Sequence, residues 1–338
     1  MGSALSKKLK VQTGVVRPPI SSITAPQPEP AVAIGEGEVI DGPSFEHPYK
    51  DPRARDDNFS FPLDESDLSS VSDEKLLEIF LTAPRLHHYG AVRIVRISKT
   101  LVIKGGGGVT LAEARNMIFA AETLHLQVPK VHRAFGASIP DSWGDPVQSH
   151  FIVMDYVSGP TVEDCWDSLS QDERDSVAQQ LASMIETMQS KPLNDLAPGP
   201  LGGNEGKAFE GPWFTDYGAG PFATLQDLED WCNHKIDVCL RFQQISEDTP
   251  RFKFHDAVLT HQDIAARNLI LDPRGKLWLI DWGCAGIYPR GFEQAAFSEQ
   301  SWNDELNEMV LSKLSDRQEI LTKQYRAIAY GLSTAALL

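Results

Sequence analysis

One stretch, residues 258–286 (VLTHQDIAARNLILDPRGKLWLIDWGCAG), restricts the possible folds more than any other part of the chain. Two apolar runs, LIL and LWLI, flank the turn sequence DPRG at 272–275, so we expect a hairpin here. The hairpin would return Asp281, which follows the second run, to the neighbourhood of Asn268. Because Asp263 lies five residues before Asn268, two carboxylates and one amide are expected close together.

The expected cluster indicates a particular chemistry. An amide and a carboxylate beside a second carboxylate form an all-oxygen site, which suits the hard cation Mg²⁺ when it holds a polyphosphate. Asn268 and Asp281 are therefore candidate metal ligands, and Asp263 is a candidate base that faces an attacking hydroxyl. Any one of these residues alone is more simply explained as a turn residue or a strand-end cap. The combined spacing, H-x-D-x-x-x-x-N followed by an apolar residue and D-W-G, is much more specific.

The rest of the chain divides into a short β-rich part and a longer helical part. Strand-like runs are expected at 92–98, 100–104, 131–137 and 150–157, the first two as a tight hairpin and the last as a central strand. Helical periodicity is found at 72–83, 110–126, 171–189, 224–244 and in much of 302–337. We therefore predict an α+β, two-lobed fold with a small β-rich N-lobe (46–157) and a larger, mainly helical C-lobe (158–338).

The first 45 residues differ from the remainder. They are rich in proline and glycine, which predicts a disordered arm. The opening MGSALSKK fits the N-myristoylation pattern with Gly2 as acceptor. Lys7, Lys8 and Lys10 would add the electrostatic attraction that a single acyl chain needs for membrane contact. Peripheral membrane contact through this arm is one expectation, and a chance start or a cloning scar is the other.

Charge and cysteine content restrict the kinds of partner and the cellular compartment that we expect for this protein. The chain carries 47 acidic and 31 basic residues, a net charge of −16, so nucleic acid is not expected as a partner. Its four cysteines show no C-x-x-C spacing, which favours neither a zinc site nor a disulfide framework. Scattered cysteines of this kind are typical of a cytoplasmic protein.

The segments HQDIAARN and IDWG resemble the catalytic and metal-binding loops of protein-kinase-like phosphotransferases. More closely, the chain resembles the aminoglycoside phosphotransferase family, whose pattern is H-G-D-x-x-x-x-N-x-L-x followed by I-D-W-x-x-A-G, with Gln262 in place of the usual glycine. The resemblance covers roughly residues 85–290, and the order of its blocks is similar to that of the broad fungal branch. It implies a two-lobed protein-kinase-like fold with ATP in the cleft.

The resemblance also implies a role for each matching residue in this segment. Asp263 would orient and deprotonate the substrate hydroxyl, and His261 would brace the catalytic loop by hydrogen bonding. Asn268 and Asp281 would bind Mg²⁺ on the nucleotide phosphates. The implied reaction is transfer of the γ-phosphate of ATP to a hydroxyl of a small molecule.

Upstream positions would form the nucleotide site. Lys104 would contact the α- and β-phosphates, and Glu113 would pair with Lys104. Thr110-x-x-Glu113 also fits a capping box for the helix that follows, so the ion pair and the cap are alternatives for Glu113. The backbone around three hinge residues would face adenine: Asp155, Tyr156 and Val157.

Departures from the kinase pattern leave two further readings open. No G-x-G-x-x-G precedes Lys104, so the turn at 98–100 would have to cover the nucleotide. The missing glycine loop favours a catalytically silent kinase-like protein that binds nucleotide or acts as a scaffold. The AARN at 265–268 also resembles the loop of tyrosine kinases, but too few residues follow Asp281 for an activation segment and a full helical lobe. A small-molecule phosphotransferase is the leading hypothesis.

Overall fold

The computed structural model describes residues 51–338 except 90, 141–144, 204–205, 216 and 300–302. At residues 88 and 89 it describes the backbone alone. The predicted arm at 1–45, with Gly2, Lys7, Lys8 and Lys10, lies outside these residues. The described residues belong to one compact unit. Within them, no helix is both long and apolar enough to cross a lipid bilayer.

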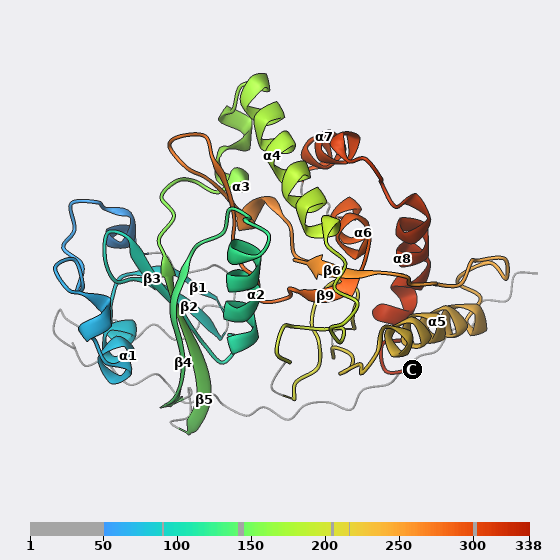
Figure 1. The fold of residues 1–338 in the computed structure, drawn as a ribbon, viewed down its shortest axis with the longest axis horizontal. Coiled ribbons are helices and arrows are strands. Elements are labelled where there is room, and N and C mark those ends of the chain that lie inside the picture. Colours follow the sequence, from blue (N-terminus) through green and yellow to red (C-terminus); the bar gives the residue numbers. More distant parts are fainter. Residues whose placement is uncertain (1–50, 90, 141–144, 204–205, 216, 300–302) are drawn as a thin grey trace, which may run out of the picture. The chain divides into compact units, whose positions relative to one another are not determined.

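Five strands form an antiparallel sheet in the order β1-β2-β3-β5-β4 (Figure 1). Their bounds are β1 (Arg85–Tyr89), β2 (Val92–Arg96), β3 (Leu101–Gly106), β4 (Val131–Pro140) and β5 (Pro146–Asp155). The predicted hairpin is confirmed as β2 and β3, and β5 lies centrally between β3 and β4, as its nearly continuous apolar sequence indicates. Strand β1 was not predicted, because its sequence RLHHY carries no apolar alternation.

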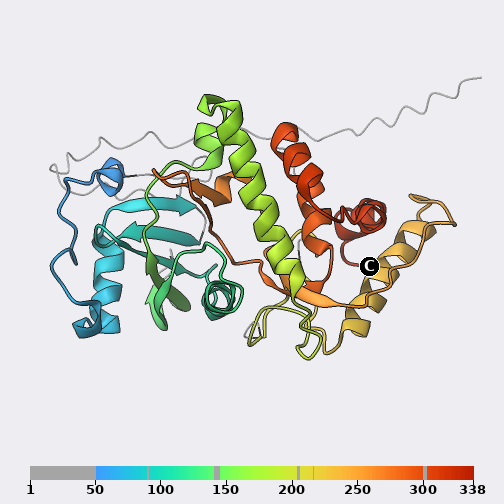
Figure 2. The same cartoon turned by 45° about the horizontal axis from the view of Figure 1, so that its top comes forward.

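The two faces of the sheet are covered by different helices. On one face, α1 (Asp73–Thr82) packs against a cluster that contains Ile103 and Val153. On the other face, α2 (Leu111–Glu122) packs with Val102 and Ile152. Because side chains alternate along a strand, Lys104 lies on the same face as Val102, toward α2. Figures 1 and 2 show α1 and α2 on either side of the strands.

The C-lobe is mainly helical. Its helices are α3 (Val162–Cys165), α4 (Gln171–Ser190), α5 (Leu225–Arg241), α6 (Phe292–Ser298), α7 (Asp304–Lys313) and α8 (Glu319–Leu332). The long helical region predicted at 302–337 is divided into α7 and α8, and α6 was not predicted. Helix α4 packs against α7, and α5 packs against α8 (Figure 2). The α+β, two-lobed kinase-like fold is confirmed.

Two short sheets position the 258–286 segment. Strand β6 (Ala257–Thr260) pairs with β9 (Gly286–Pro289), and β7 (Leu269–Leu271) pairs with β8 (Leu277–Leu279). The β7–β8 hairpin is the one that the DPRG turn predicts. Its pairing continues for one further step, because the Ile280 N–H donates to the Asn268 carbonyl (3.0 Å). Asp281 is thereby held next to Asn268, as the sequence predicts.

A cluster of aromatic rings supports this segment from within the C-lobe. Trp213 is fully buried and stacks on Phe292, with ring centroids 3.7 Å apart. Its indole N–H donates to the Phe292 carbonyl at the start of α6 (2.9 Å). Tyr325 of α8 packs on the same indole, 4.4 Å between centroids. These contacts fix α6 in place, which matters because α6 holds the backbone of His261 and Gln262.

Candidate active site

A cavity of about 750 Å³ lies between the five-stranded sheet and the β7–β8 hairpin. Apolar side chains face it from both sides, Val102 and Ile94 from the sheet and Ile270 and Ile280 from the hairpin. An apolar slot with a few polar groups at one end is typical of a small-molecule site. Of the residues predicted for the site, all but His261 line this cavity: Lys104, Glu113, Asp155, Tyr156, Val157, Asp263, Asn268 and Asp281.

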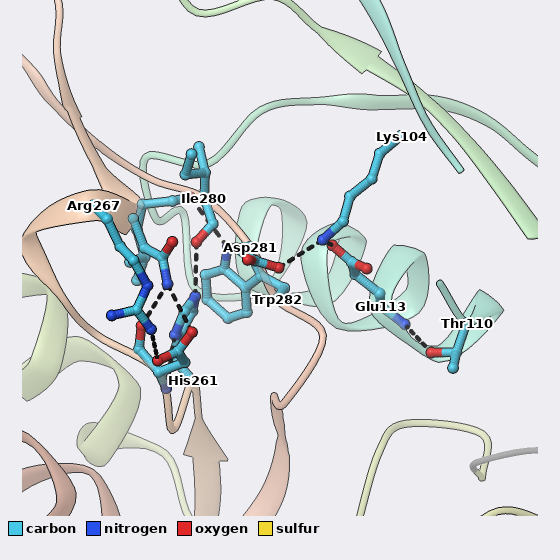
Figure 3. Close-up of polar contacts among 11 residues, drawn as sticks. Lys104, Thr110, Glu113, His261, Arg267, Ile280, Asp281 and Trp282 are labelled. Atoms are coloured by element: carbon cyan, nitrogen blue, oxygen red, sulfur yellow. Dashed lines mark hydrogen bonds and ion pairs between the residues drawn. The ribbon is translucent and has the colours of Figure 1, made fainter. Parts of the chain in front are cut away.

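Lys104 links the two halves of the cavity. Its ammonium group lies 2.6 Å from Glu113 Oε1 and 2.6 Å from Asp281 Oδ1 (Figure 3). Burial alone would lower the pKa of Lys104, but the two carboxylates raise it above its ordinary value. Lys104 in turn holds the pKa of Asp281 below the ordinary value, mainly through its charge. A permanent cation and an ionised carboxylate therefore face the same space.

The two alternatives for Glu113 prove compatible. Thr110 Oγ1 accepts a hydrogen bond from the Glu113 backbone N–H (3.3 Å) and so caps α2. The Glu113 side chain turns to Lys104 instead of returning to the Thr110 backbone, so only the threonine half of a capping box forms. Figure 3 shows both contacts from the first turn of α2.

These contacts give a testable separation of the two roles. Glu113→Gln leaves the Thr110 cap in place but removes one of the two charges that hold Lys104. We expect phosphoryl transfer to fall on the order of tenfold, the factor that corresponds to a lost charge-assisted hydrogen bond. Thr110→Ala should instead lower the free energy of unfolding by about 1 kcal/mol and change turnover far less. Wild-type turnover in Glu113→Gln, measured beside thermal unfolding of both variants, would contradict the ion-pair role.

Asp263 is held by two neighbours on the loop predicted to be catalytic. Its Oδ2 accepts from the Asn268 amide (2.8 Å), and its Oδ1 accepts from the Arg267 guanidinium (2.5 Å). The Asn268 amide also donates to the Asp263 carbonyl (2.8 Å). The short 3₁₀ turn η4 (Ala266–Asn268) reverses the chain between the two residues. The five-residue spacing therefore places the Asn268 amide in contact with the Asp263 carboxylate. Arg267 was not singled out from the sequence.

His261 lies behind the cavity and joins its two loops. Its Nδ1 accepts from the Asp263 backbone N–H (3.2 Å), so Nε2 carries the hydrogen and donates to the Ile280 carbonyl (3.0 Å). Burial lowers the pKa of His261, which favours this neutral form. The ring also packs edge-on against Trp282, at 4.8 Å between centroids (Figure 3). The imidazole thus ties the loop before Asp263 to the strand end before Asp281.

Two residues of this region adopt a left-handed backbone. Gln262 has φ of 65° and Asp281 has φ of 66°, in a region that few non-glycine residues occupy. Aspartate tolerates this backbone conformation better than most residues do. At position 262 the conformation explains why the family that the chain resembles has glycine there. The chain accepts some strain beside Asp263, on the order of 1 kcal/mol.

Glu293 is a site residue that the sequence analysis missed. It is fully buried on α6, and its carboxylate accepts the backbone N–H groups of His261 and Gln262, the latter at 3.0 Å. Burial is the main cause that raises the pKa of Glu293 to about 7. The only local signal is a single acid within the apolar run GFEQAAF. Glu293 therefore anchors the strained backbone that precedes Asp263.

The raised pKa of Glu293 predicts a pH dependence of stability. Its ordinary pKa is 4.5 and its folded value about 7, so the folded state binds more protons than the unfolded state between these pH values. The stability contributed by protonated Glu293 is complete below about pH 4.5 and is lost as pH rises to about 7. Glu293→Gln keeps an acceptor and cannot ionise. Across that window wild type should lose roughly 3 kcal/mol of unfolding free energy relative to the variant. Unfolding free energies from denaturant titrations that change with pH in the same way for wild type and Glu293→Gln would contradict this prediction.

The predicted hinge, residues 155–157, lies at the end of β5. The Tyr156 N–H donates to the Thr100 carbonyl (2.7 Å), while the Asp155 carboxylate is 2.7 Å from His132 Nε2. The turn at 98–100 therefore packs on the hinge, and the sheet covers the cavity with side chains of β1 and β2, among them Leu86 and Val92. The turn itself does not line the cavity, and the expectation that it covers a nucleotide stays a prediction.

Comparison with known proteins identifies the family. A model of the phosphotransferase enzyme family (APH) matches residues 109–328, well over half of the chain. The chain belongs to this family. As a member it is a kinase-like phosphotransferase, the class of enzyme that the motifs predict. No curated protein matches the chain.

Solved aminoglycoside phosphotransferases are among the structures similar to this chain. ADP-bound APH(2'')-Ib is 16% identical and has a TM-score of 0.47, with 77% of this chain and 91% of that chain covered. APH(4)-Ia is 16% identical with a TM-score of 0.47, and 77% of this chain and 88% of that chain are covered. The streptomycin–ATP complex of APH(2'')-IIa is 16% identical with a TM-score of 0.44, covering 79% of this chain and 94% of that chain. These likenesses are too distant to assign a site or a substrate.

Proposed function

We propose that the protein transfers the γ-phosphoryl group of ATP to a hydroxyl of a small molecule, with Asp263 as base. The observation that carries this proposal is the convergence of Lys104, Asp281, Asn268 and Asp263 on one cavity. Family membership supports the reaction class. The apolar slot between Val102 and Ile280 suits a nucleotide base, and Asp155, Tyr156 and Val157 line the same cavity.

The chain's own residues divide the reaction between them. Lys104 offers a positive charge to the nucleotide phosphates, and its ion pair with Glu113 fixes the direction of the ammonium group. Asp263 receives the proton of the acceptor hydroxyl. The acceptor oxygen then forms a bond to the γ-phosphorus as the bond between that phosphorus and ADP breaks. His261, as the positioning residue, keeps the Asp263 loop in register with Asp281.

The donor chemistry of the site fits Mg²⁺. Within the described part of the chain, the Asn268 amide uses only its nitrogen, and Asp281 uses only Oδ1, so Asn268 Oδ1 and Asp281 Oδ2 receive no hydrogen bond. These two oxygens would hold the ion, since Mg²⁺ is usually bound through one or two protein groups plus substrate phosphates. When bound, Mg²⁺ neutralises charge on the transferring phosphates. The described residues contain no cluster of three or more His, Cys, Asp or Glu that could hold a metal by themselves.

The proposal is tested by incubating the purified protein with γ-labelled ATP and a panel of hydroxyl-bearing metabolites. We expect label to move to at least one small molecule, in an acceptor-dependent manner. ATP binding with no transfer to any compound would favour the silent nucleotide-binding alternative. Transfer to polypeptides alone would favour a protein kinase. Either outcome would overturn the proposed function.

A further inference from the structure

A segment that precedes the sheet, residues 51–64, lies along the sheet and the hinge. We call it the strap. The Asp51 N–H donates to the Arg85 carbonyl at the start of β1 (2.7 Å), and the Leu63 N–H donates to the Ile97 carbonyl (2.8 Å). Asp64 accepts the backbone N–H of Lys99 in the β2–β3 turn (2.8 Å). The strap is thus fixed at both ends, and it lies outside the residues matched by the family model, 109–328.

A buried arginine holds the middle of the strap. Arg96, at the end of β2, is 1% exposed. Its guanidinium donates to two strap groups, the Ala54 carbonyl (3.2 Å) and Asp57 Oδ1 (2.9 Å). It also donates to two carbonyls of the β2–β3 turn, those of Ser98 (3.2 Å) and Lys99 (3.1 Å). A buried charge is costly unless it is well hydrogen-bonded, and Arg96 meets that requirement by bridging strap and turn.

The same guanidinium lies against the hinge. The Arg96 Cζ atom is 3.8 Å from the ring centroid of Tyr156 and 4.6 Å from that of Phe61 in the strap. A planar guanidinium stacks well on aromatic faces, and the attraction is stronger when water is excluded. Arg96 therefore couples the position of the strap to that of Tyr156, which lines the cavity.

The strap also brings a cation to the cavity. Arg55 is the last residue of the short helix η1 (Pro52–Arg55), and it lines the cavity together with Leu86 of β1. Its neighbour Ala54 is fully buried and is held by Arg96, so the backbone that presents Arg55 is fixed. The strap attaches at the start of β1 and at the hinge. The phosphate-binding part of the cavity is a different part, the one where Lys104 and Asp281 lie.

We propose that the strap is a wall of the nucleotide site, in which Arg55 contacts the nucleoside part of ATP and Arg96 is the positioning residue. This inference rests on the proposed function, because it takes ATP to be the ligand of the cavity. A guanidinium has five donors and a flat face, so it suits ribose hydroxyls or the edge and face of a base. The strap thereby provides part of the cover that the absent glycine-rich loop leaves open.

Isothermal titration of the full chain with ATP and with adenosine tests the proposal. Arg55→Gln should weaken both ligands by a similar factor, about tenfold for one lost charged contact. Arg53→Gln is the matched control: Arg53 lies on the same short helix, pairs with Asp51, and should leave both affinities near wild type. Unchanged affinities in Arg55→Gln, or a loss for ATP alone, would overturn the proposal. If the wild-type protein binds neither ligand, the proposed function itself fails.

Arg96→Lys tests the positioning role. Lysine keeps the positive charge but lacks the planar guanidinium group that contacts the strap, the β2–β3 turn and the rings of Tyr156 and Phe61. We expect weaker adenosine binding in a variant whose thermal unfolding remains cooperative, with the acceptor KM unchanged. A folded Arg96→Lys protein with wild-type adenosine affinity would overturn this role. Should the variant not fold, the exposed Arg55 substitution still decides the proposal.

Discussion

Replacing Asp263 by Asn should lower phosphoryl transfer by about two to four orders of magnitude, the usual contribution of a general base. Asparagine matches aspartate in size and retains one oxygen that can accept from the Asn268 amide. It gives up the contact with Arg267, whose side chain is half exposed, so the buried side of the loop should keep its shape. What it lacks is the ability to take the hydroxyl proton. ATP affinity should therefore change little, because Lys104 and Asp281 are untouched. Turnover with labelled ATP and calorimetric binding of MgATP measure the two effects separately.

Asp230→Asn is the control for this substitution. Asp230 is exposed on α5, where it accepts from Gln226 (2.9 Å), and its change should leave turnover at the wild-type level. Comparable turnover in Asp263→Asn and wild type would remove the base assignment.

Lys104→Met should lower kcat/KM for ATP by roughly 100-fold or more, the scale on which loss of one electrostatic contact slows charge-stabilised transfer. The substitution also leaves Glu113 and Asp281 without the cation that both now contact at 2.6 Å. Since Lys104 holds the pKa of Asp281 down, that pKa should rise in the variant. The acidic limb of the activity profile should accordingly move to higher pH. Rate profiles against pH and ATP concentration measure both changes.

Lys99→Met serves as the matched control, because Lys99 is an exposed lysine in the turn that precedes the same strand. It should change neither the ATP dependence nor the pH profile. A Lys104→Met enzyme with wild-type kcat/KM would exclude the phosphate-binding role.

The sequence predicts the site best where local spacing is enough. A turn between two apolar runs determines the β7–β8 hairpin, and the hairpin brings Asp281 to Asn268. A five-residue spacing around η4 likewise brings Asn268 to Asp263. These contacts depend on neighbours in the chain, so the residue pattern is sufficient to predict them.

Contacts between distant segments could not be predicted in this way. Glu293 meets His261 because Trp213 packs α6 under the loop that contains His261, and no motif marks that packing. Arg96 breaks the apolar alternation of its strand, a sign of a special role, but its partners Asp57 and Tyr156 lie far away in the chain. Strand β1 is an edge strand with polar residues. It becomes a strand because it pairs with β2, and its own residue pattern does not predict one.

The central claim is that two acidic residues divide the work, with Asp263 acting on the acceptor hydroxyl and Asp281 on the nucleotide and its Mg²⁺. The most direct test measures the MgATP dissociation constant and the turnover number of Asp263→Asn and Asp281→Asn side by side. We predict a crossed result: Asp263→Asn binds MgATP like wild type but turns over about two to four orders of magnitude more slowly, whereas Asp281→Asn loses MgATP affinity itself. Equal loss of MgATP affinity in both variants, or unchanged affinity in Asp281→Asn, would contradict this division.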